Sequence, residues 1–393
     1  MTYQSTSPRY HVVDALRGFA IVSIMLLHNI EHFDFYFKPP GLPVWMVSMD
    51  KGVWDTLFFL FAGKSYAIFA MLFGLTFFIQ TNNQEKKGKD FRGRFAWRLV
   101  LLMGFGIINS AFYQGDILTL YAAVGFLLIP FARVNNKVVL VVAVLLFIQP
   151  LNLWHLFTVI QNPEMEIANP LSWSYFGKMA PYIKDHSLWT TIYGNLTNGK
   201  TAVVLWNWEN GRFFHMLALF MIGMLMGRKQ LFAENSQNKK FWLRTLIVSA
   251  IVFIVLFVIQ KNAGSYLTTK ALKRAFMTLE KPWTNIAFMF VLVSVFTMFF
   301  WSKVGSKILG IFSPIGKMSL SNYIFQSIMG ATIYYGFGLA MYQYTGATYS
   351  TLIGLLLAVL MGVFCTWWAK RFTHGPLEHL WHKATWVKIG KRE

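Results

Sequence analysis

Long runs of apolar residues restrict the fold of this chain more than any other feature of its sequence. A helix needs about 20 mostly apolar residues to cross the hydrocarbon core of a bilayer. Because lipid offers no hydrogen-bond partners to the backbone, such runs form helices rather than open strands. We therefore expect an all-α, polytopic transmembrane helix bundle of about ten spans. The ten segments are 12–30, 57–80, 95–113, 116–132, 137–155, 213–232, 242–260, 284–302, 318–338 and 350–369.

The composition agrees with a membrane protein. Charged residues make up 13% of the chain and hydrophobic residues 55%, whereas a soluble domain carries about a quarter charged residues. The single cysteine, Cys365, excludes a disulfide framework and a cysteine metal site. No metal site is expected from the histidines either, because they lack ligand spacing on any one helix.

We expect residues 1–393 to form a single integral membrane domain. The first apolar segment is interrupted by charges and no small-residue cleavage site follows it, so it predicts a retained span rather than a signal peptide. Residues 156–212 are polar and rich in tryptophan, which is typical of an extracytoplasmic loop with interfacial aromatics. Residues 370–393 follow the last expected span and are predicted to form a cytoplasmic C-terminal tail.

The basic residues predict the orientation of the chain. With the N-terminus inside, the cytoplasmic segments hold roughly twice as many Lys and Arg residues as the outer ones. Both termini are therefore expected in the cytoplasm, although the outer segment 261–281 is itself basic. Most of the net charge of +20 then faces anionic lipid of the bilayer, and a nucleic-acid partner is not expected.

Three ionisable residues lie in the first apolar segment, 14-DALRGFAIVSIMLLHN-29. Asp14 and Arg17 are three residues apart, so they share a helix face. They form a structural ion pair, an interface anchor or part of a site. Arg17 and His28 also share a face, about 16 Å apart along the axis. They are therefore candidates for lining one tunnel. Taken alone, a histidine near a helix end such as His28 is more often an interface residue than a catalyst.

Other polar residues at membrane depth allow two interpretations each. Lys64 either extends its ammonium group to the interface or pairs with Asp14, Asp55 or Asp116. Asn322 and Gln326 serve either helix contacts or a site.

The basic run Arg92, Arg94 and Arg98 precedes the third expected span. It is either a stop-transfer anchor or a clamp for phosphate, whose oxygens match the guanidinium fork. The chain has no GxxxxGK[ST] phosphate loop, no GxSxG elbow and no HExxH motif. Inverted halves with broken helices, a common transporter pattern, are not evident.

Six stretches carry a resemblance to a known family: 14-DALRGFAI-21, 63-GKSYAIFAMLFG-74, 115-GDILTLYAAVGFLLIPF-131, 222-IGMLMGR-228, 316-GKMSLSNYIFQS-327 and 375-GPLEHLWHKATW-386. In this order they resemble the YeiB-like family of bacterial inner-membrane proteins. The resemblance implies a multi-pass protein of the bacterial cytoplasmic (inner) membrane. That family is grouped with transmembrane acyltransferases, which move an acyl group from cytosolic acyl-CoA to a sugar or similar acceptor across the membrane.

The O-acetyltransferase branch of that superfamily carries an arginine, ten residues and a histidine in its first span, and Arg17 and His28 have this spacing. Its late motif, G-x-x-S-Y-x-x-Y-L-x-H, is similar to 316-GKMSLSNYIFQ-326. There Leu320 replaces the first tyrosine and Gln326 the histidine. Ala62 stands where the YeiB-like family usually has an acidic residue before Gly-Lys.

The resemblance implies an acyltransferase with acetyl-CoA or another acyl-CoA as donor and an extracytoplasmic glycan or small-molecule hydroxyl or amine as acceptor. Its expected site residues fall into two groups. The donor is held by Arg17, Lys64, Arg94 and Arg98. In the transfer step, His28 acts as general base and Asp14 fixes Arg17. An oxyanion is stabilised by Asn29, Asn322 or Gln326. Two other classes stay open: a transporter or flippase of a small or lipid-linked solute, and an envelope scaffold or sensor that uses 156–212 for recognition.

Overall fold

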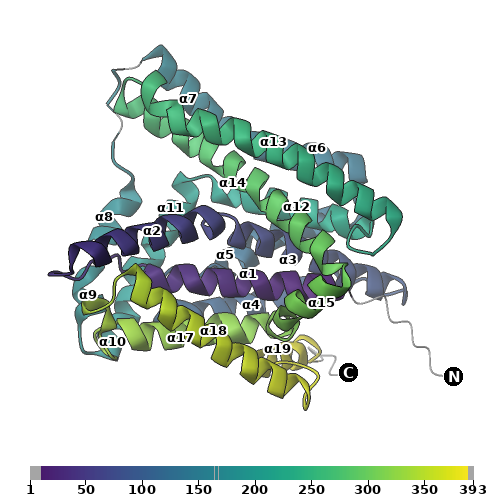
Figure 1. Ribbon diagram of the computed structural model, residues 1–393. Helices are drawn as coiled ribbons and strands as arrows, with labels where there is room; N and C mark the ends of the chain where they lie inside the picture. Colours follow the sequence, from purple (N-terminus) through teal and green to yellow (C-terminus); the bar gives the residue numbers. More distant parts are fainter. Residues whose placement is uncertain (1–9, 163, 167, 388–393) are drawn as a thin grey trace, which may run out of the picture.

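A computed structural model describes residues 10–162, 164–166 and 168–387, and the described residues form helices and loops with no strand. The expected all-α bundle is confirmed (Figure 1). Its main helices are α1 His11–Ile30, α2 Val44–Phe61, α3 Ser65–Glu85, α4 Arg92–Phe112, α5 Leu118–Leu128, α6 Asn136–Ile148, α7 Pro150–Gln161, α12 Arg212–Arg228, α13 Ser236–Tyr266, α14 Lys270–Phe300, α17 Ser319–Tyr334, α18 Ala347–Ala369 and α19 Pro376–Thr385. The shorter helices are η1 Ile129–Arg133, α8 Leu171–Gly177, α9 Ala180–Lys184, α10 Leu188–Gly194, η2 Asn195–Gly199, α11 Lys200–Glu209, α15 Lys303–Leu309, η3 Gly310–Phe312, α16 Ser313–Lys317 and η4 Met341–Gln343.

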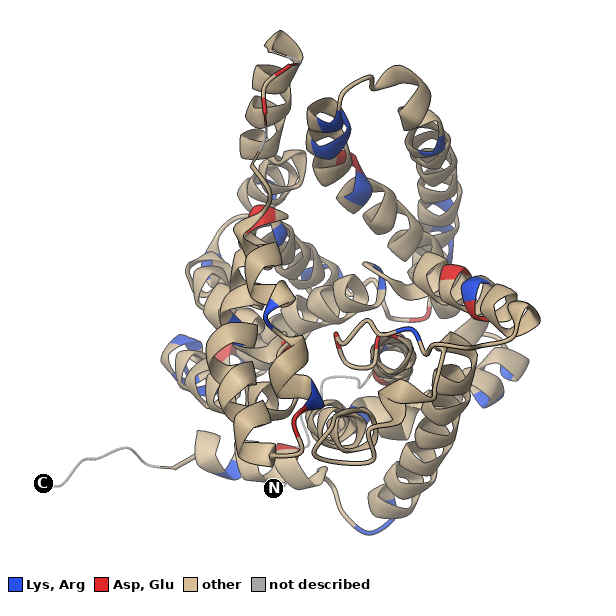
Figure 2. Cartoon of the chain, turned by 90° about the vertical axis from the view of Figure 1, so that its left-hand side faces the viewer, with Lys and Arg blue, Asp and Glu red and all other residues tan. Residues whose placement is uncertain are grey.

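Within the described residues, seven helical segments are long and apolar enough to cross a membrane. They are His11–Ile30, Val44–Glu85, Arg92–Phe112, Asn136–Gln161, Ser236–Tyr266, Lys270–Phe300 and Ala347–Ala369. The expected segments 116–132, 213–232 and 318–338 form shorter helices, and α12 and α17 are largely buried. Charged residues are sparse along the helices (Figure 2). The chain is therefore a helical membrane protein.

Two expected spans contain a break that the apolar pattern did not reveal. Segment 57–80 is interrupted between α2 and α3, where Gly63 has a φ of 77°. Segment 137–155 is interrupted at Gln149, which has a φ of 58° and precedes Pro150. A left-handed residue ends a helix, and a proline is suited to the first turn of the next one.

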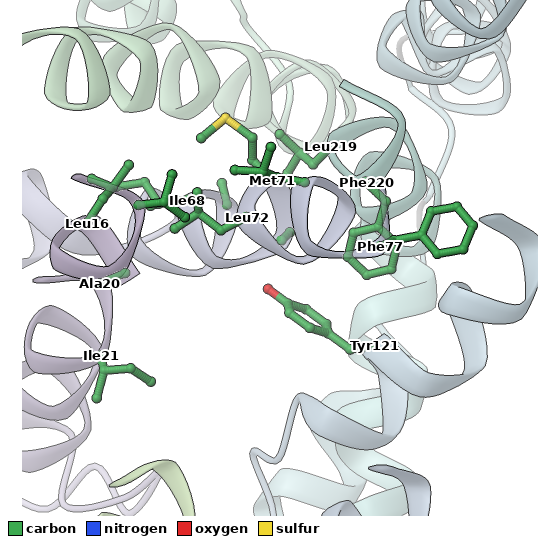
Figure 3. Packing of buried hydrophobic residues seen from close by; sticks show 14 of the residues in the cluster. Leu16, Ala20, Ile21, Ile68, Met71, Leu72, Phe77, Tyr121, Leu219 and Phe220 are labelled. Atoms are coloured by element: carbon green, nitrogen blue, oxygen red, sulfur yellow. The ribbon is translucent and has the colours of Figure 1, made fainter. Parts of the chain in front are cut away.

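The centre of the bundle lies where α3 crosses α12, and α3 also contacts α1 (Figure 3). The backbones of α3 and α12 touch at two glycines. A Cβ on Gly74 would lie 1.8 Å from the Phe220 carbonyl oxygen, and one on Gly223 would lie 1.8 Å from that of Met71. Glycine is therefore required at both positions for this crossing.

The described ends of the chain lie at one end of the bundle, where α19 packs against α4 and α17 near the start of α1 (Figure 1). The segment expected as a C-terminal tail thus contains a docked helix. The segment 156–212 contains the end of α7 and four α-helices, α8 to α11. Helices α13 and α14 pair with each other, and most of α13 is exposed.

Candidate functional site

A cavity of about 200 Å³ lies inside the bundle at the end where α1 begins and α19 docks. Residues far apart in the sequence line it, because α1, α3, α4, α5, α17 and α19 meet there. Its charged lining residues are Arg17, Arg98, Lys317 and Glu378, and its aromatic ones are Phe69, Phe73, Phe77, Phe95, Tyr121 and Trp381. The cavity thus combines a cationic part with aromatic walls.

Arg17 enters the cavity from α1. Its Nη1 lies 3.4 Å from Asp14 Oδ1, and its Nη2 donates a 3.0 Å hydrogen bond to Thr76 Oγ1 on α3. The backbone around Asp14 contacts Gly316, where a Cβ would lie 1.8 Å from the Asp14 carbonyl oxygen. The expected ion pair between Asp14 and Arg17 is therefore present, and it holds the guanidinium between α1 and α3.

Arg98 enters the same cavity from α4. Its guanidinium stacks over the Trp381 ring at 4.0 Å, and its Nη1 donates to Thr385 Oγ1 at 3.3 Å. Its buried Nε has no hydrogen-bond partner among the described residues. Stacking orients the guanidinium plane, and an unpaired N–H of a buried cation is costly unless a ligand meets it.

Helix α19 lines one side of the cavity through Glu378 and Trp381. Glu378 accepts hydrogen bonds from the backbone N–H groups of Leu320 at 2.7 Å and Ser321 at 3.1 Å, and thereby caps the start of α17. Trp381 Nε1 donates to the Arg98 carbonyl at 3.1 Å. The sequence did not single out Glu378 or Trp381 as site residues. The only signal was their presence in the C-terminal stretch 375–386.

Arg94 and Lys64 lie outside this cavity. Arg94 Nη1 donates to the carbonyls of Thr385 at 2.8 Å and Val387 at 3.1 Å, so it secures the end of α19. Lys64 lies at the break between α2 and α3, with its Nζ 5.8 Å and 5.7 Å from the ring centroids of Phe59 and Phe288.

The carboxylates considered as partners for Lys64 form ion pairs with other side chains. Asp116 pairs with Lys200 at 3.2 Å, and Asp55 pairs with Lys51 at 2.6 Å. The break after α2 turns Lys64 toward α14 instead, where aromatic rings surround it. One interpretation of the sequence expected Lys64 to pair with Asp14, Asp55 or Asp116, but no such ion pair is found among the described residues.

His28 lies near the other end of α1 in a pocket of aromatic rings. Its ring centroid is 4.6 Å from that of Tyr113, 5.6 Å from that of Phe33 and 6.4 Å from that of Tyr323. Its buried Nδ1 has no hydrogen-bond partner among the described residues. The imidazole is thus held by ring contacts, which leave a nitrogen for a proton or a ligand.

Two carboxylates follow directly after α1, beside His28 and its aromatic neighbours. Tyr113 donates to Asp34 Oδ1 at 3.3 Å, and Tyr36 donates to Glu31 Oε1 at 3.0 Å. Burial, and then the charge of Asp34, raise the pKa of Glu31 to about 8; burial raises the pKa of Asp34 to about 6. Sequence reasoning missed this pair, although 31-EHFDFY-36 directly follows the first span.

The three candidate amides differ in what they contact. Asn29 accepts a 3.0 Å hydrogen bond from Tyr334 and donates to its own helix, and Asn322 contacts Cys365 Sγ at 3.2 Å. Both are therefore occupied by helix contacts. Gln326 is fully buried, and neither its Nε2 nor its Oε1 has a partner among the described residues.

Two tyrosines lie on the way from the cavity to His28. Tyr121 lines the cavity and donates to the Tyr66 carbonyl at 2.7 Å. Tyr323 packs near His28, and its hydroxyl accepts from the Ile117 N–H at 3.3 Å. Ile117 in turn accepts a backbone hydrogen bond from Tyr121 at 2.9 Å, so both tyrosines contact the start of α5. The cationic cavity and the histidine pocket are thus linked through the start of α5.

Comparisons with known proteins identify relatives of this chain. A family profile described as "Protein of unknown function (DUF418)" matches residues 226–388. The uncharacterized protein YxaH of Bacillus subtilis is 28% identical, and the match covers 98% of this chain and 97% of that protein. An uncharacterized 39.9 kDa protein of Bacillus acidopullulyticus is 26% identical over 96% of this chain and 94% of its own length. The uncharacterized protein YeiB of Escherichia coli is 25% identical over 95% of each chain.

No solved structure matches the chain significantly. Within the described residues, no group of three or more His, Cys, Asp or Glu side chains is arranged to hold a metal ion. The site therefore has to be interpreted from its own geometry.

Proposed function

Because this chain belongs to the YeiB-like family, whose relatives named above are uncharacterized, we propose its function from its own residues: an acyltransferase of the bacterial cytoplasmic membrane. The donor is an acyl-CoA, such as acetyl-CoA, bound at the end of the bundle where α1 begins and α19 docks. The acceptor is a hydroxyl or amine of a glycan or small molecule that approaches from the opposite side of the membrane.

The observation that carries this proposal is the meeting of Arg17 and Arg98 in one cavity with aromatic walls. Guanidinium groups match phosphate oxygens, and CoA carries its phosphates at one end and its thioester at the other. At about 200 Å³ the cavity is smaller than the usual pocket for a complete drug-sized ligand. We therefore place the CoA phosphates at Arg17 and Arg98 and the nucleotide outside the cavity. The pantetheine arm then extends past Tyr121 and Tyr323 so that the acyl group reaches His28.

The transfer step assigns the proton to His28. The acceptor oxygen or nitrogen attacks the thioester carbonyl carbon while the imidazole takes the acceptor proton. The resulting tetrahedral intermediate breaks its C–S bond, and the proton passes to the leaving CoA thiolate. The free Nδ1 of His28 and the aromatic surroundings of the ring support this role.

A developing oxyanion needs a hydrogen-bond donor that is not already occupied. Among the three candidate amides, only Gln326 has a donor without a partner in the described part of the chain, because Asn29 and Asn322 bond to neighbouring groups. Gln326 follows Tyr323 by one helical turn on α17, and Tyr323 packs near His28. We therefore assign the oxyanion to Gln326 rather than to the other two amides.

The proposal is tested in membrane vesicles that contain the protein, oriented so that the end where α1 begins and α19 docks faces the external medium. Radiolabelled acetyl-CoA is added outside, and a panel of monosaccharides and amino sugars is enclosed inside. Acetylated product and released CoA thiol are measured together. His28→Ala is compared with His155→Ala, which removes an exposed histidine on α7.

We expect equal amounts of product and thiol in the wild type and the His155 variant, and neither in the His28 variant. Transfer that survives in His28→Ala overturns the assignment of the base. Movement of an enclosed sugar without any CoA release indicates transport instead and overturns the acyltransferase proposal.

A further inference from the structure

A second, larger cavity lies between α6, α12, α13 and α14, remote from the Arg17–Arg98 cavity. It has a volume of about 900 Å³, and its walls are almost entirely apolar. We propose that this groove binds one anionic phospholipid from the membrane leaflet at the end of the bundle where α1 begins and α19 docks. The proposal is independent of the acyltransferase proposal, because the two cavities share no residue.

The length of the groove fits one leaflet. It runs along α6 from Asn136 to Phe147 and along α13 from Phe241 to Leu256. At 1.5 Å per residue these stretches measure about 17 to 23 Å. Half of a bilayer of about 40–45 Å, headgroups included, is about 20 to 22 Å. The length of the groove therefore suits one lipid of one leaflet, headgroup included.

Three cations lie at one end of the groove: Lys137 at the start of α6, Lys229 directly after α12, and Arg244 near the start of α13. All three are exposed, and among the described residues none of their side-chain nitrogens forms a hydrogen bond or an ion pair. The described residues that line the groove include no Asp or Glu. Three unpaired cations beside an apolar groove complement a phosphate group that carries acyl chains.

Neighbouring cations at the same end, in contrast, form hydrogen bonds or ion pairs. Arg228 donates to the carbonyls of Val134, Phe131 and Ala132 at 2.7 to 2.9 Å, and Lys239 pairs with Glu234 at 2.8 Å. The absence of partners is thus a feature of the three groove cations rather than of all basic residues in this region.

The far end and the side of the groove also fit a lipid. At the far end Trp283 Nε1 donates to the Phe147 carbonyl at 2.6 Å, which satisfies a polar group that would otherwise face the acyl chains. Along the side, Val248 is 60% exposed and Leu140 is 47% exposed. A lipid can therefore enter sideways from the bilayer without crossing the protein.

The test measures lipid binding to the purified protein in nonionic detergent. Phosphatidylglycerol and phosphatidylcholine with the same acyl chains are titrated separately, and bound lipid is counted by native mass spectrometry. We expect phosphatidylglycerol to bind at least about tenfold more tightly, because it carries a net negative charge, whereas the choline ammonium of phosphatidylcholine offsets its phosphate and is repelled by the three cations.

Two variants and one control sharpen the test. The triple variant Lys137→Gln, Lys229→Gln, Arg244→Gln should lose the preference for phosphatidylglycerol. Lys240→Gln, an exposed residue of α13 outside the groove, should keep it. Ser249→Trp, which fills the groove without changing its charge, should weaken binding of both lipids.

Equal binding of the two lipids by the wild type overturns the proposal. A preference that survives in the triple variant also overturns it, because the anion would then bind elsewhere. Undiminished binding in Ser249→Trp shows that the chains do not occupy the groove and has the same consequence.

Discussion

The ionisable side chains near the two ends of α1 differ in the partners that hold them. At the termini end, Arg17 is held by Asp14 and Thr76, and Arg98 by Trp381 and Thr385. At the other end, His28 touches rings but has a buried nitrogen without a partner among the described residues.

This difference in partners matches the two functions that we propose, donor binding and proton transfer. Groups that bind a charged ligand need fixed positions, and the bonds to Arg17 and Arg98 supply them. A group that moves a proton needs a nitrogen that is not already occupied, and His28 provides one. In the proposed mechanism, donor binding belongs to one end of α1 and proton transfer to the other.

The largest expected effect comes from His28→Ala. Loss of a general base lowers the rate about 10²- to 10⁴-fold. We expect kcat for acetyl transfer to fall by this amount, with the donor dissociation constant unchanged because His28 lies outside the donor cavity. Initial rates and donor titrations check this. A matched fall in donor affinity would contradict the separation of tasks.

Arg98→Ala should act on binding. A charge-assisted hydrogen bond contributes about 1.5–3 kcal/mol, so we expect the KM for acyl-CoA to rise about 10- to 100-fold. The control is Arg133→Gln, an exposed residue that pairs with Glu85 at 3.2 Å. Surface pairs of this kind contribute little, and the KM should be unchanged. A large effect in the control and none in Arg98→Ala would refute the assignment.

Glu378→Gln tests whether α19 lines one side of the cavity. The carboxylate caps two backbone N–H groups of α17, and loss of a cap costs about 1 kcal/mol. We expect a lower Tm and faster cleavage after α18 in limited proteolysis. Glu378→Asp, which keeps the charge, should retain part of the stability. Cleavage at the wild-type rate in Glu378→Gln would show that α19 docks without this contact.

The smallest effect concerns pH. Glu31 and Asp34 have folded-state pKa values of about 8 and about 6, above their usual values. The folded state therefore holds these protons more tightly, so stability falls as pH rises from about 5 to 8 and levels off above the higher pKa. Tm measured across this range should fall less in Glu31→Gln. The same decline in variant and wild type would contradict the clustered carboxylates.

The sequence predicted the helical class because apolar runs and the scarcity of charge leave few other folds. It also placed Asp14 and Arg17 on one helix face, since they are three residues apart, and left an ion pair as one of the open interpretations. It did not predict the breaks at Gly63 and Gln149, because a hydropathy pattern does not register a left-handed backbone.

The rest of the site depends on contacts between distant segments. Arg98 meets Trp381 only because α19 folds back onto α4, and no local pattern reveals that docking. For the same reason, Asn322 and Gln326 looked alike in the sequence. Only tertiary contacts distinguish the occupied amide of Asn322 from the unpartnered amide of Gln326.

Calorimetric titration of acetyl-CoA into the purified protein in detergent tests the central claim most directly. We compare the wild type, His28→Ala and the double variant Arg17→Ala, Arg98→Ala. The account predicts saturable binding of equal affinity in the wild type and His28→Ala, and no measurable binding in the double variant. Absence of binding by the wild type, for acetyl-CoA and for longer acyl-CoAs alike, would contradict it.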